Sequence, residues 1–463
     1  MAKCVDNLPD ELLIELLRWL PVSDLKSARL TCTRWSDIGA TMLFRRIYFS
    51  PRKIEMEAFA NITQHPLLRK GVRELIYDGR LFRHECLQGG EYIAAYDRYR
   101  GVYGNDDEDD QVWRNWHNLL DPRDPESLAK GLQGYACLFD EQEHILNSGH
   151  DYQSLLAGLE RLPTLTTLRV QDDFYFGDWL PFYDDADDWY EEKTARDFVG
   201  VLPPSSWNPW RNTEAAAPEG WAWDCRGVSN LFKAVSRHCG NIKGLFLGSQ
   251  ASKAPLAFFH SVATIPIHIA ELAPNLRVLK IDCEASTNDE DETVSQEISS
   301  LAAMASQAKT LEALSTSMGV RGDRWLKVIL GPVWPQLRVL DIGDIRLTQA
   351  SFVAIVRPHR ATLSQLKLRN ICLLDDLEES WIELGEKLGQ LVKLDSILLS
   401  GLVSEALMQV SDGPYLATET TLEVAKKIMK WVARPELLTN IHPDMEAQVM
   451  AIRKTAPVSA VFA

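Results

Sequence analysis

Two short juxtapositions hold the residue types that most often carry out chemistry in proteins. His84, Glu85 and Cys86 are consecutive, and His238 is followed by Cys239. A zinc site needs a second pair of ligands at a regular spacing, and neither group has one, so both are predicted to be structural. The sequence also lacks the phosphate-loop, dinucleotide, nucleophile-elbow and zinc-protease patterns. We therefore predict a protein that is not an enzyme and that uses no metal and no cofactor.

Acidic residues and tryptophans gather in two stretches and could recognise a ligand. The run at residues 106–110 is followed by Trp113 and Trp116. The second stretch offers Trp179, Asp184, Asp185, Asp187, Asp188 and Trp189. Aromatic side chains often anchor interfaces, and carboxylates beside them would select a basic segment, so this stretch is a candidate for binding a basic target protein. Alternatively, the tryptophans pack long loops in place while the carboxylates stay solvated.

Charge and composition restrict the remaining classes of ligand and the compartment. The net charge is −16, and residues 101–200 hold 23 acidic against 7 basic side chains, which argues against nucleic acid as the main ligand. No stretch reaches the roughly 18 apolar residues of a membrane span, and no apolar signal segment opens the chain. The eight cysteines form no CxxC pair. We expect a cytoplasmic and/or nuclear protein that binds neither nucleic acid nor membrane.

Three short helices are predicted within the first 50 residues. Pro9 suits the start of a helix, whose apolar face is built from Leu8, Leu12, Leu13, Leu16, Leu17 and Leu20. Ser23 is expected to cap a second helix that carries Leu25 and Trp35 on one side, and a third should follow near Thr41. So small a unit cannot cover all of these side chains, and apolar surface left exposed usually marks a binding site.

This segment resembles an F-box. The resemblance rests on the opening Leu-Pro-x-Glu, the leucine-rich first helix, Asp-Leu after the proline turn, and Leu-x-Cys-x-Arg-Trp at the end, and it covers about a tenth of the chain. The next segment, residues 43–47, is similar to the one that joins F-boxes to substrate domains in fungal proteins.

The resemblance implies docking on a Skp-family adaptor, which would connect the chain to the cullin and RING subunits of an SCF ubiquitin ligase. The positions that match the contact pattern are Leu8, Pro9, Leu12, Leu16, Leu25 and Trp35. Alternatively, the leucines only pack within a helical subdomain. We favour that interpretation for Leu13 and Leu17.

The rest of the chain shows a repeated pattern in which apolar residues occupy the first, fourth and sixth of six positions. Eight such windows begin at Val72, Leu165, Ile242, Leu276, Leu311, Leu337, Leu363 and Leu394. The first and the fifth end imperfectly, in Tyr77 and Thr316. Each predicts a short strand, and the last five begin 35, 26, 26 and 31 residues apart, which leaves room for a helix in every interval. Helical apolar faces are expected around Leu301, Phe352 and Leu384.

This alternation resembles a degenerate leucine-rich-repeat array. Ile345, Ile371 and Leu402 replace the Asn or Cys expected in three repeats, so the repeat number stays open. The predicted fold class is α/β, with a three-helix F-box followed by an irregular solenoid of alternating strands and helices. An ordinary α/β domain would give the same alternation.

The predicted domains are an F-box at residues 1–50, a degenerate repeat domain at 51–415, and a C-terminal capping helix with a tail at 416–463. Acidic, tryptophan-rich insertions are expected at about 80–155 and 171–225. The function predicted from these features is a substrate-recognition subunit of an SCF-type ubiquitin ligase. The alternative is a scaffold or regulator that acts outside a cullin complex.

Overall fold

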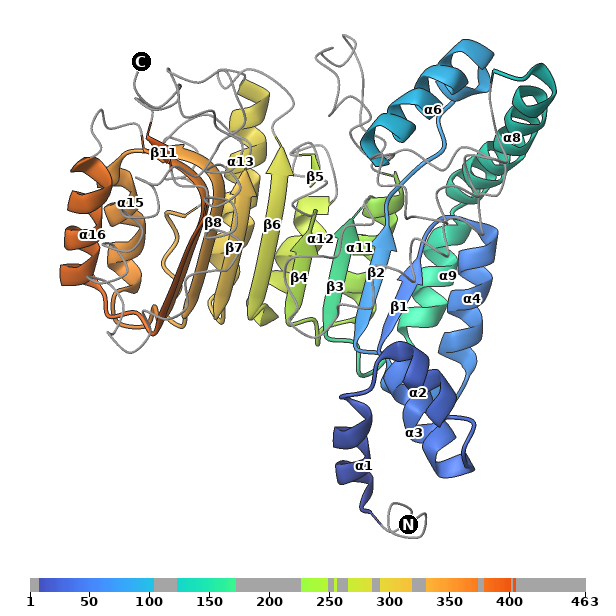
Figure 1. The fold of residues 1–463 in the computed structure, drawn as a ribbon, viewed down its shortest axis with the longest axis horizontal. Helices are drawn as coiled ribbons and strands as arrows, with labels where there is room; N and C mark the ends of the chain where they lie inside the picture. The colour runs from blue at the N-terminus through green and yellow to red at the C-terminus, as the bar shows by residue number, and fades with distance from the viewer. Residues whose placement is uncertain are drawn as a thin grey trace, which may run out of the picture. The chain divides into compact units, whose positions relative to one another are not determined.

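The computed structural model describes residues 8–103, 123–171, 226–248, 254–255, 265–284, 292–318, 330–373, 379–400 and 403–404. The chain separates into two compact units. Figure 1 labels the helices and strands of both along the chain. Unit 1 comprises residues 1–242 with 248–252, and unit 2 comprises residues 243–247 with 253–463.

Unit 1 combines N-terminal helices with three strands and further helices. Its helices are α1 (Asp10–Leu17), α2 (Val22–Ala28), α3 (Thr33–Leu43), α4 (Lys53–Gln64), α5 (Leu68–Gly71), the 3-10 turn η2 (Glu85–Leu87), α6 (Gly89–Tyr103), α8 (Pro125–Ser148), α9 (His150–Leu159) and α11 (Arg226–His238). Its strands are β1 (Arg46–Phe49), β2 (Glu74–Asp78) and β3 (Thr167–Gln171). The strands are parallel, and β2 pairs with both others.

Aromatic packing joins the strands of unit 1 to the helices that cover them. Phe49 of β1 meets Phe59 of α4 edge to face, with ring centroids 5.0 Å apart. Gly158 of α9 lies against the same ring, because a Cβ there would stand 2.0 Å from Phe59 Cε1. Tyr77 of β2 similarly fills the space beside Gly227 of α11. The core of unit 1 therefore lies between its strands and α4, α9 and α11.

The segment between β2 and β3 is largely helical where the structure describes it. Asp124 caps α8 by accepting a hydrogen bond from the Ser127 N–H at 2.9 Å, and Gly149 ends the helix in the left-handed conformation, at φ 68°. A separate core forms between α6, η2 and α8, and its buried members are Phe82, Cys86, Tyr92, Tyr96 and Tyr135. The insertion predicted at about 80–155 therefore includes a helical lobe with its own aromatic core.

Unit 2 alternates strands and helices. Its strands are β4 (Gly244–Leu247), β5 (Ala254–Pro255), β6 (Val278–Glu284), β7 (Ala313–Met318), β8 (Val339–Leu347), β9 (Gln365–Leu373), β10 (Ser396–Ser400) and β11 (Val403–Ser404). Its helices are α12 (Ile265–Leu272), η4 (Ala273–Asn275), α13 (Glu292–Gln307), α15 (Gln349–Val356), η5 (Arg357–His359) and α16 (Glu379–Leu391). Strands β4, β6, β7, β8, β9 and β10 pair in that order, and every pair is parallel.

All eight predicted strands are confirmed, and each begins two residues after the start of its window. The first apolar residue of each window is buried, as at Ile242 and Leu276. The helices predicted around Leu301, Phe352 and Leu384 are confirmed as α13, α15 and α16.

Two N-terminal predictions are wrong in detail. Ser23 does not cap the second helix, because α2 already begins at Val22 after Pro21. The third helix is α3, which starts at Thr33 and not near Thr41, so Trp35 belongs to it. Strand β1 was not predicted. The residues predicted for the C-terminal capping helix lie outside the described part of the chain.

Candidate functional site

The first three helices share a small apolar core. Leu13, Leu17, Leu25 and Ala28 are buried together. Partly buried side chains surround them, namely Leu20, Trp35, Ile38, Met42 and Leu43. Burial of one leucine contributes about 2 kcal/mol. Helix α3 adds several of the partly buried side chains to this small core. Leu13 and Leu17 thus have the packing role that their positions predict.

The face of α1 beside the buried leucines, and the turn after the helix, present large apolar side chains to solvent. Leu12 is 53% exposed, Leu16 is 50% exposed and Trp19 is 74% exposed. Leu12 and Leu16 are four residues apart on one face of α1. Trp19 lies in the turn that follows the helix, where its N–H donates to the Leu16 carbonyl, and we call these three side chains the exposed row. Leu30, just after α2, is 88% exposed. A soluble domain gains nothing from such a row by itself, which makes it the candidate docking surface.

Arg34 of α3 fixes the start of α1. Its guanidinium lies 2.5 Å from Asp10 Oδ1, and it also donates to the backbone carbonyl of Leu8. Pro9 precedes the helix as its exposed N-cap, while Leu8 is partly buried. The Leu-Pro pair is therefore held at a defined position beside the exposed row of α1.

The predicted adaptor contacts do not all share this surface. Leu12 and Leu16 belong to the exposed row, and Pro9 adjoins it. Leu25 packs inside the core, at 6% exposed, and Trp35 is partly buried against that core. Sequence reasoning missed Trp19, although it follows Leu16 by only three residues. The predicted target-binding residues Trp179, Asp184, Asp185, Asp187, Asp188 and Trp189 lie outside the described residues.

Charged side chains link the three strands of unit 1. Glu74 Oε2 lies 3.2 Å from Arg46 Nε, and Glu74 Oε1 lies 3.0 Å from Arg169 Nε. Burial alone would raise the pKa of Glu74, but the guanidinium groups of Arg169 and Arg46 together hold it below its ordinary value. Glu74 of β2 thus forms ion pairs with both neighbouring strands, β1 and β3. Its role is explained by the structure of the sheet.

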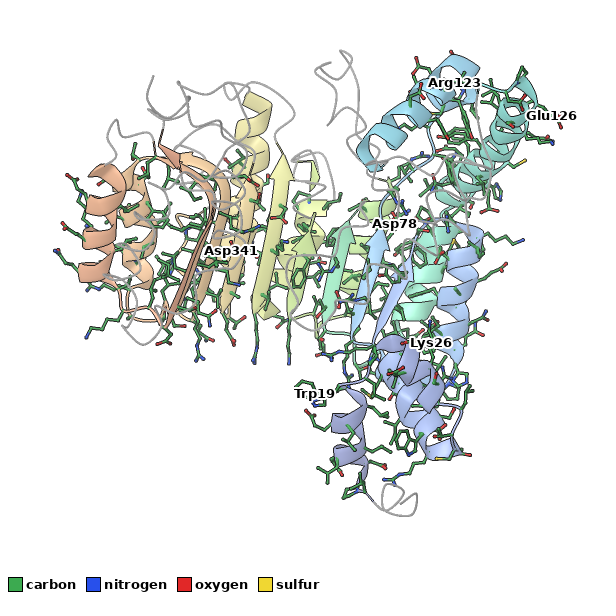
Figure 2. All side chains as sticks on the ribbon, viewed as in Figure 1. Trp19, Lys26, Asp78, Arg123, Glu126 and Asp341 are labelled. Atoms are coloured by element: carbon green, nitrogen blue, oxygen red, sulfur yellow. The ribbon has the colours of Figure 1, made fainter. Side chains whose placement is uncertain are left out.

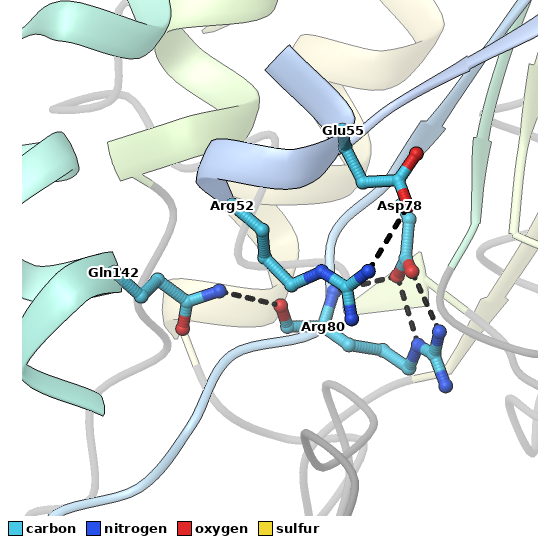
Figure 3. A network of polar contacts seen from close by, with 5 residues as sticks. All are labelled: Arg52, Glu55, Asp78, Arg80 and Gln142. Carbon is cyan, nitrogen blue, oxygen red and sulfur yellow. Dashed lines mark hydrogen bonds and ion pairs between the residues drawn. The ribbon is translucent and has the colours of Figure 1, made fainter. Parts of the chain in front are cut away.

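A second polar network joins the ends of β1 and β2 to the helical lobe (Figure 3). Asp78 accepts two hydrogen bonds from Arg80, at 2.9 and 2.6 Å, and Arg52 pairs with Glu55 at 3.0 Å. Gln142 of α8 donates to the Arg80 carbonyl and accepts from the Phe82 N–H. Buried charges need partners of this kind, and here they position the chain that leaves β2.

Buried charges also occur on the strands of unit 2. Lys280 Nζ lies 2.9 Å from Asp282 Oδ2 within β6, and Arg369 Nε of β9 lies 3.1 Å from Asp341 Oδ1 of β8. Burial raises the pKa of Asp341, and the neighbouring Arg369 opposes that rise. The first pair lies within β6, and the second links β8 to β9. Both are accounted for as structural ion pairs.

The residues first considered for chemistry are separated or inert. Cys86 is buried in the aromatic core of the lobe, whereas His84 and Glu85 are exposed. Burial raises the pKa of the Cys239 thiol to about 12, so this group stays protonated and unreactive at neutral pH. Among the described residues, no three metal-ligating side chains gather. No helix in the described part of the chain is long and apolar enough to cross a membrane.

Comparison with known proteins places the N-terminal helices in a family. Residues 5–50 match the F-box-like family, which makes this segment an F-box-like domain. A protein of Arabidopsis thaliana described as an F-box protein is 24% identical over 156 residues. That match covers 32% of this chain and 45% of the relative, so it spans less than half of the relative's length.

Proposed function

We propose that this chain, with an F-box-like domain at residues 5–50, is a substrate-recognition subunit of an SCF-type ubiquitin ligase. F-box domains bind Skp-family adaptors, and F-box proteins are generally non-catalytic. The observation that carries the proposal is the exposed row of Leu12 and Leu16 on α1 and Trp19 in the turn after it. The adaptor would cover this row and connect the chain to cullin and RING subunits.

The geometry of the row suits a protein partner. Buried leucines on one face of α1 hold the helix, while Leu12 and Leu16 on the face beside them are exposed to solvent. Tryptophan is enriched among residues whose truncation costs most binding energy, so Trp19 would act as an anchor at one end of the row. Leu25 and Trp35, which match the contact pattern in sequence, would support the surface from within the core.

We propose that the remainder is a degenerate leucine-rich-repeat array of the fungal type that holds a target protein. Support comes from parallel strands that pair in chain order, with a helix described between most neighbours in unit 2. Such a receptor accelerates ubiquitin transfer by proximity, since it tethers the target near the ubiquitin-loaded enzyme. No side chain of this chain has to act as a nucleophile.

Purification of the tagged protein from its own cells tests the proposal. Co-purification of a Skp-family adaptor with cullin and RING subunits is the expected result. Recovery of the adaptor without a cullin would instead favour the scaffold or regulator. Absence of the adaptor would contradict both. The Leu12→Ala, Leu16→Ala double variant should lose all of these partners, whereas Ile54→Ala, which removes an exposed apolar side chain elsewhere, should keep them.

The acidic stretch around Trp179 and Trp189 is our proposed contact for a basic target. Its composition supports this role, since residues 184–188 contain four aspartates. Replacing Asp184, Asp185, Asp187 and Asp188 with Asn should weaken target capture and leave adaptor binding intact. Unchanged capture of every co-purifying target would eliminate this part of the proposal.

A further inference from the structure

A row of cations follows the edge of unit 2 at which its strands begin. Lys243, Arg277 and Arg338 stand immediately before β4, β6 and β8, and all three are exposed. Backbone hydrogen bonds continue the strand pairing through these residues: the Arg277 N–H donates to the Lys243 carbonyl at 2.7 Å. Lys243 and Arg277 precede neighbouring strands, which lie ~4.8 Å apart. Glu312 precedes β7 and stands between Arg277 and Arg338 along this edge. Figure 2 shows nitrogen-tipped side chains projecting from this lower edge of the strands.

The turns that lead from helices into strands add cations to the same edge. These are Lys309, Arg357, Arg360 and Lys393, and each is exposed. The segments entering the six main strands are 240–243, 273–277, 307–312, 330–338, 357–364 and 391–395. They carry seven cations against two carboxylates, Glu312 and Asp395. This excess is opposite in sign to the net charge of −16 of the whole chain.

Helix dipoles explain only part of this excess. Cations are favourable near helix C-termini, which accounts for Arg357 after α15 and Lys393 after α16. Arg338 follows an irregular turn and stands just before β8, so no helix dipole favours a cation at this position. Arg277 approaches Glu312 at 3.5 Å, but Arg338 and Arg360 have no ionic partner among the residues that the structure describes. Clustered, unpaired cations repel one another, so the edge is costly unless an anion binds there.

We propose that this basic edge, the seven cations named above, binds an acidic segment of a partner protein. Arginine guanidinium groups form paired hydrogen bonds with carboxylates, and four of the seven cations are arginines. Val333, in the turn before β8, is exposed and can contact an aliphatic side chain. The chemistry therefore fits a segment with clustered aspartates or glutamates next to an apolar residue.

Other polyanions fit this surface less well. A long nucleic acid or an anionic membrane is bound by an extended cationic surface, whereas the whole chain carries a net charge of −16. Single-stranded nucleic acid also needs exposed rings for stacking, and the rings of Trp334 and His359 in these turns are buried against each other. A short acidic peptide touches only the basic edge. The inference goes beyond the proposed function, because it assigns to unit 2 a binding surface and an acidic ligand that the proposed function does not name.

A binding assay on the full chain tests the basic edge. The probe is a short fluorescent peptide of glutamates around one leucine, and its control replaces each glutamate with glutamine. At low ionic strength the glutamate peptide should bind at least about tenfold more tightly, and added salt should remove this difference. The Arg338→Glu, Arg360→Glu variant should lose the preference. The Lys53→Glu, Lys130→Glu variant changes net charge equally at exposed positions of unit 1 and should retain it.

Three outcomes would overturn the inference: equal binding of the two peptides, equal loss in both charge-reversal variants, or tighter binding of a DNA oligonucleotide or an anionic vesicle. If charge reversal prevents folding, Arg338→Gln with Arg360→Gln replaces it and should reduce the preference in the same direction. Adaptor binding is measured on every variant. The basic edge belongs to unit 2 and α1 belongs to unit 1, so retained adaptor binding would show that a failure here leaves the proposed function standing.

Discussion

Gly71 of α5 lies directly against the backbone of Thr41 in α3. A Cβ at residue 71 would stand 2.1 Å from the Thr41 carbonyl oxygen and 2.7 Å from its Cα. Backbone atoms cannot move aside as the end of a side chain can, so only glycine permits this contact. The contact fixes the last helix of the F-box-like domain against the segment that leads into β2.

Gly71→Ala should therefore separate α3 from α5. We expect a loss of stability of about 1–3 kcal/mol, as for other overpacked sites, together with faster proteolysis between residues 43 and 53. Thermal unfolding and limited proteolysis measure the two effects. Gly90→Ala is the matched control, because a Cβ at Gly90 of α6 meets nothing within 4 Å. Similar behaviour of the two variants would show that the close approach is unimportant.

Arg34 should control how firmly the first turn of α1 is held. Arg34→Ala removes both the ion pair with Asp10 and the hydrogen bond to the Leu8 carbonyl. Because the pair is partly solvated, we expect less than about 1 kcal/mol of global stability to be lost. Hydrogen exchange at the amides of Leu12 and Leu13, which both bond to the Pro9 carbonyl, should nevertheless accelerate. Arg18→Ala is the matched control, because it breaks only the exposed ion pair with Glu15. Hydrogen exchange at Leu12 and Leu13 should stay unchanged in this variant.

Asp151 should make unit 1 less stable as the pH rises. Burial raises the pKa of this carboxyl group, and the hydrogen bond from Asn230 at 2.9 Å only partly opposes the rise. The native state thus keeps the proton to a higher pH than the unfolded state, in which the pKa of this group is ~3.9. Stability falls as the pH rises from about 4 through the raised native pKa. Asp151→Asn should flatten this dependence in thermal unfolding, and an unchanged slope would rule out Asp151 as its source.

His359 should have the opposite effect in unit 2. Burial lowers the pKa of its imidazole, although the bond to the Trp334 carbonyl acts against this. The unfolded state takes up a proton first as the pH falls below about 6.5, so stability is lost on acidification towards the lowered native pKa. His359→Asn keeps a donor for the Trp334 carbonyl and should reduce the loss. Equal acid sensitivity of both proteins would contradict this assignment.

The pattern of apolar residues was sufficient to predict the strands but not the helical lobe. Eight windows correspond to strands because alternate apolar side chains face a buried core, and Leu279 and Ile281 of β6 illustrate this regularity. Helix α8 carries an N-cap at Asp124 and a left-handed glycine at Gly149, signals that the acidic composition of the surrounding stretch obscured. Strand β1 is only four residues long, and so short a segment shows little periodicity.

The docking surface could not be predicted without knowing how the first three helices pack against one another. A leucine-rich helix does not reveal which leucines face a partner until α2 and α3 take their positions. Leu25 matches the contact pattern in sequence yet packs inside, whereas Leu30, just after α2, is exposed. The cations of the basic edge are far apart in sequence and become neighbours only through parallel pairing of the strands.

Affinity of the purified chain for a Skp-family adaptor tests the central claim most directly. Isothermal titration should show tight binding by the wild-type protein and a loss of at least about a hundredfold in the Leu12→Ala, Leu16→Ala, Trp19→Ala variant. A variant with Ile54→Ala and Ile267→Ala, which removes comparably exposed side chains outside α1, should bind like the wild type. Undiminished binding by the triple variant, or no binding by the wild-type protein, would contradict the account.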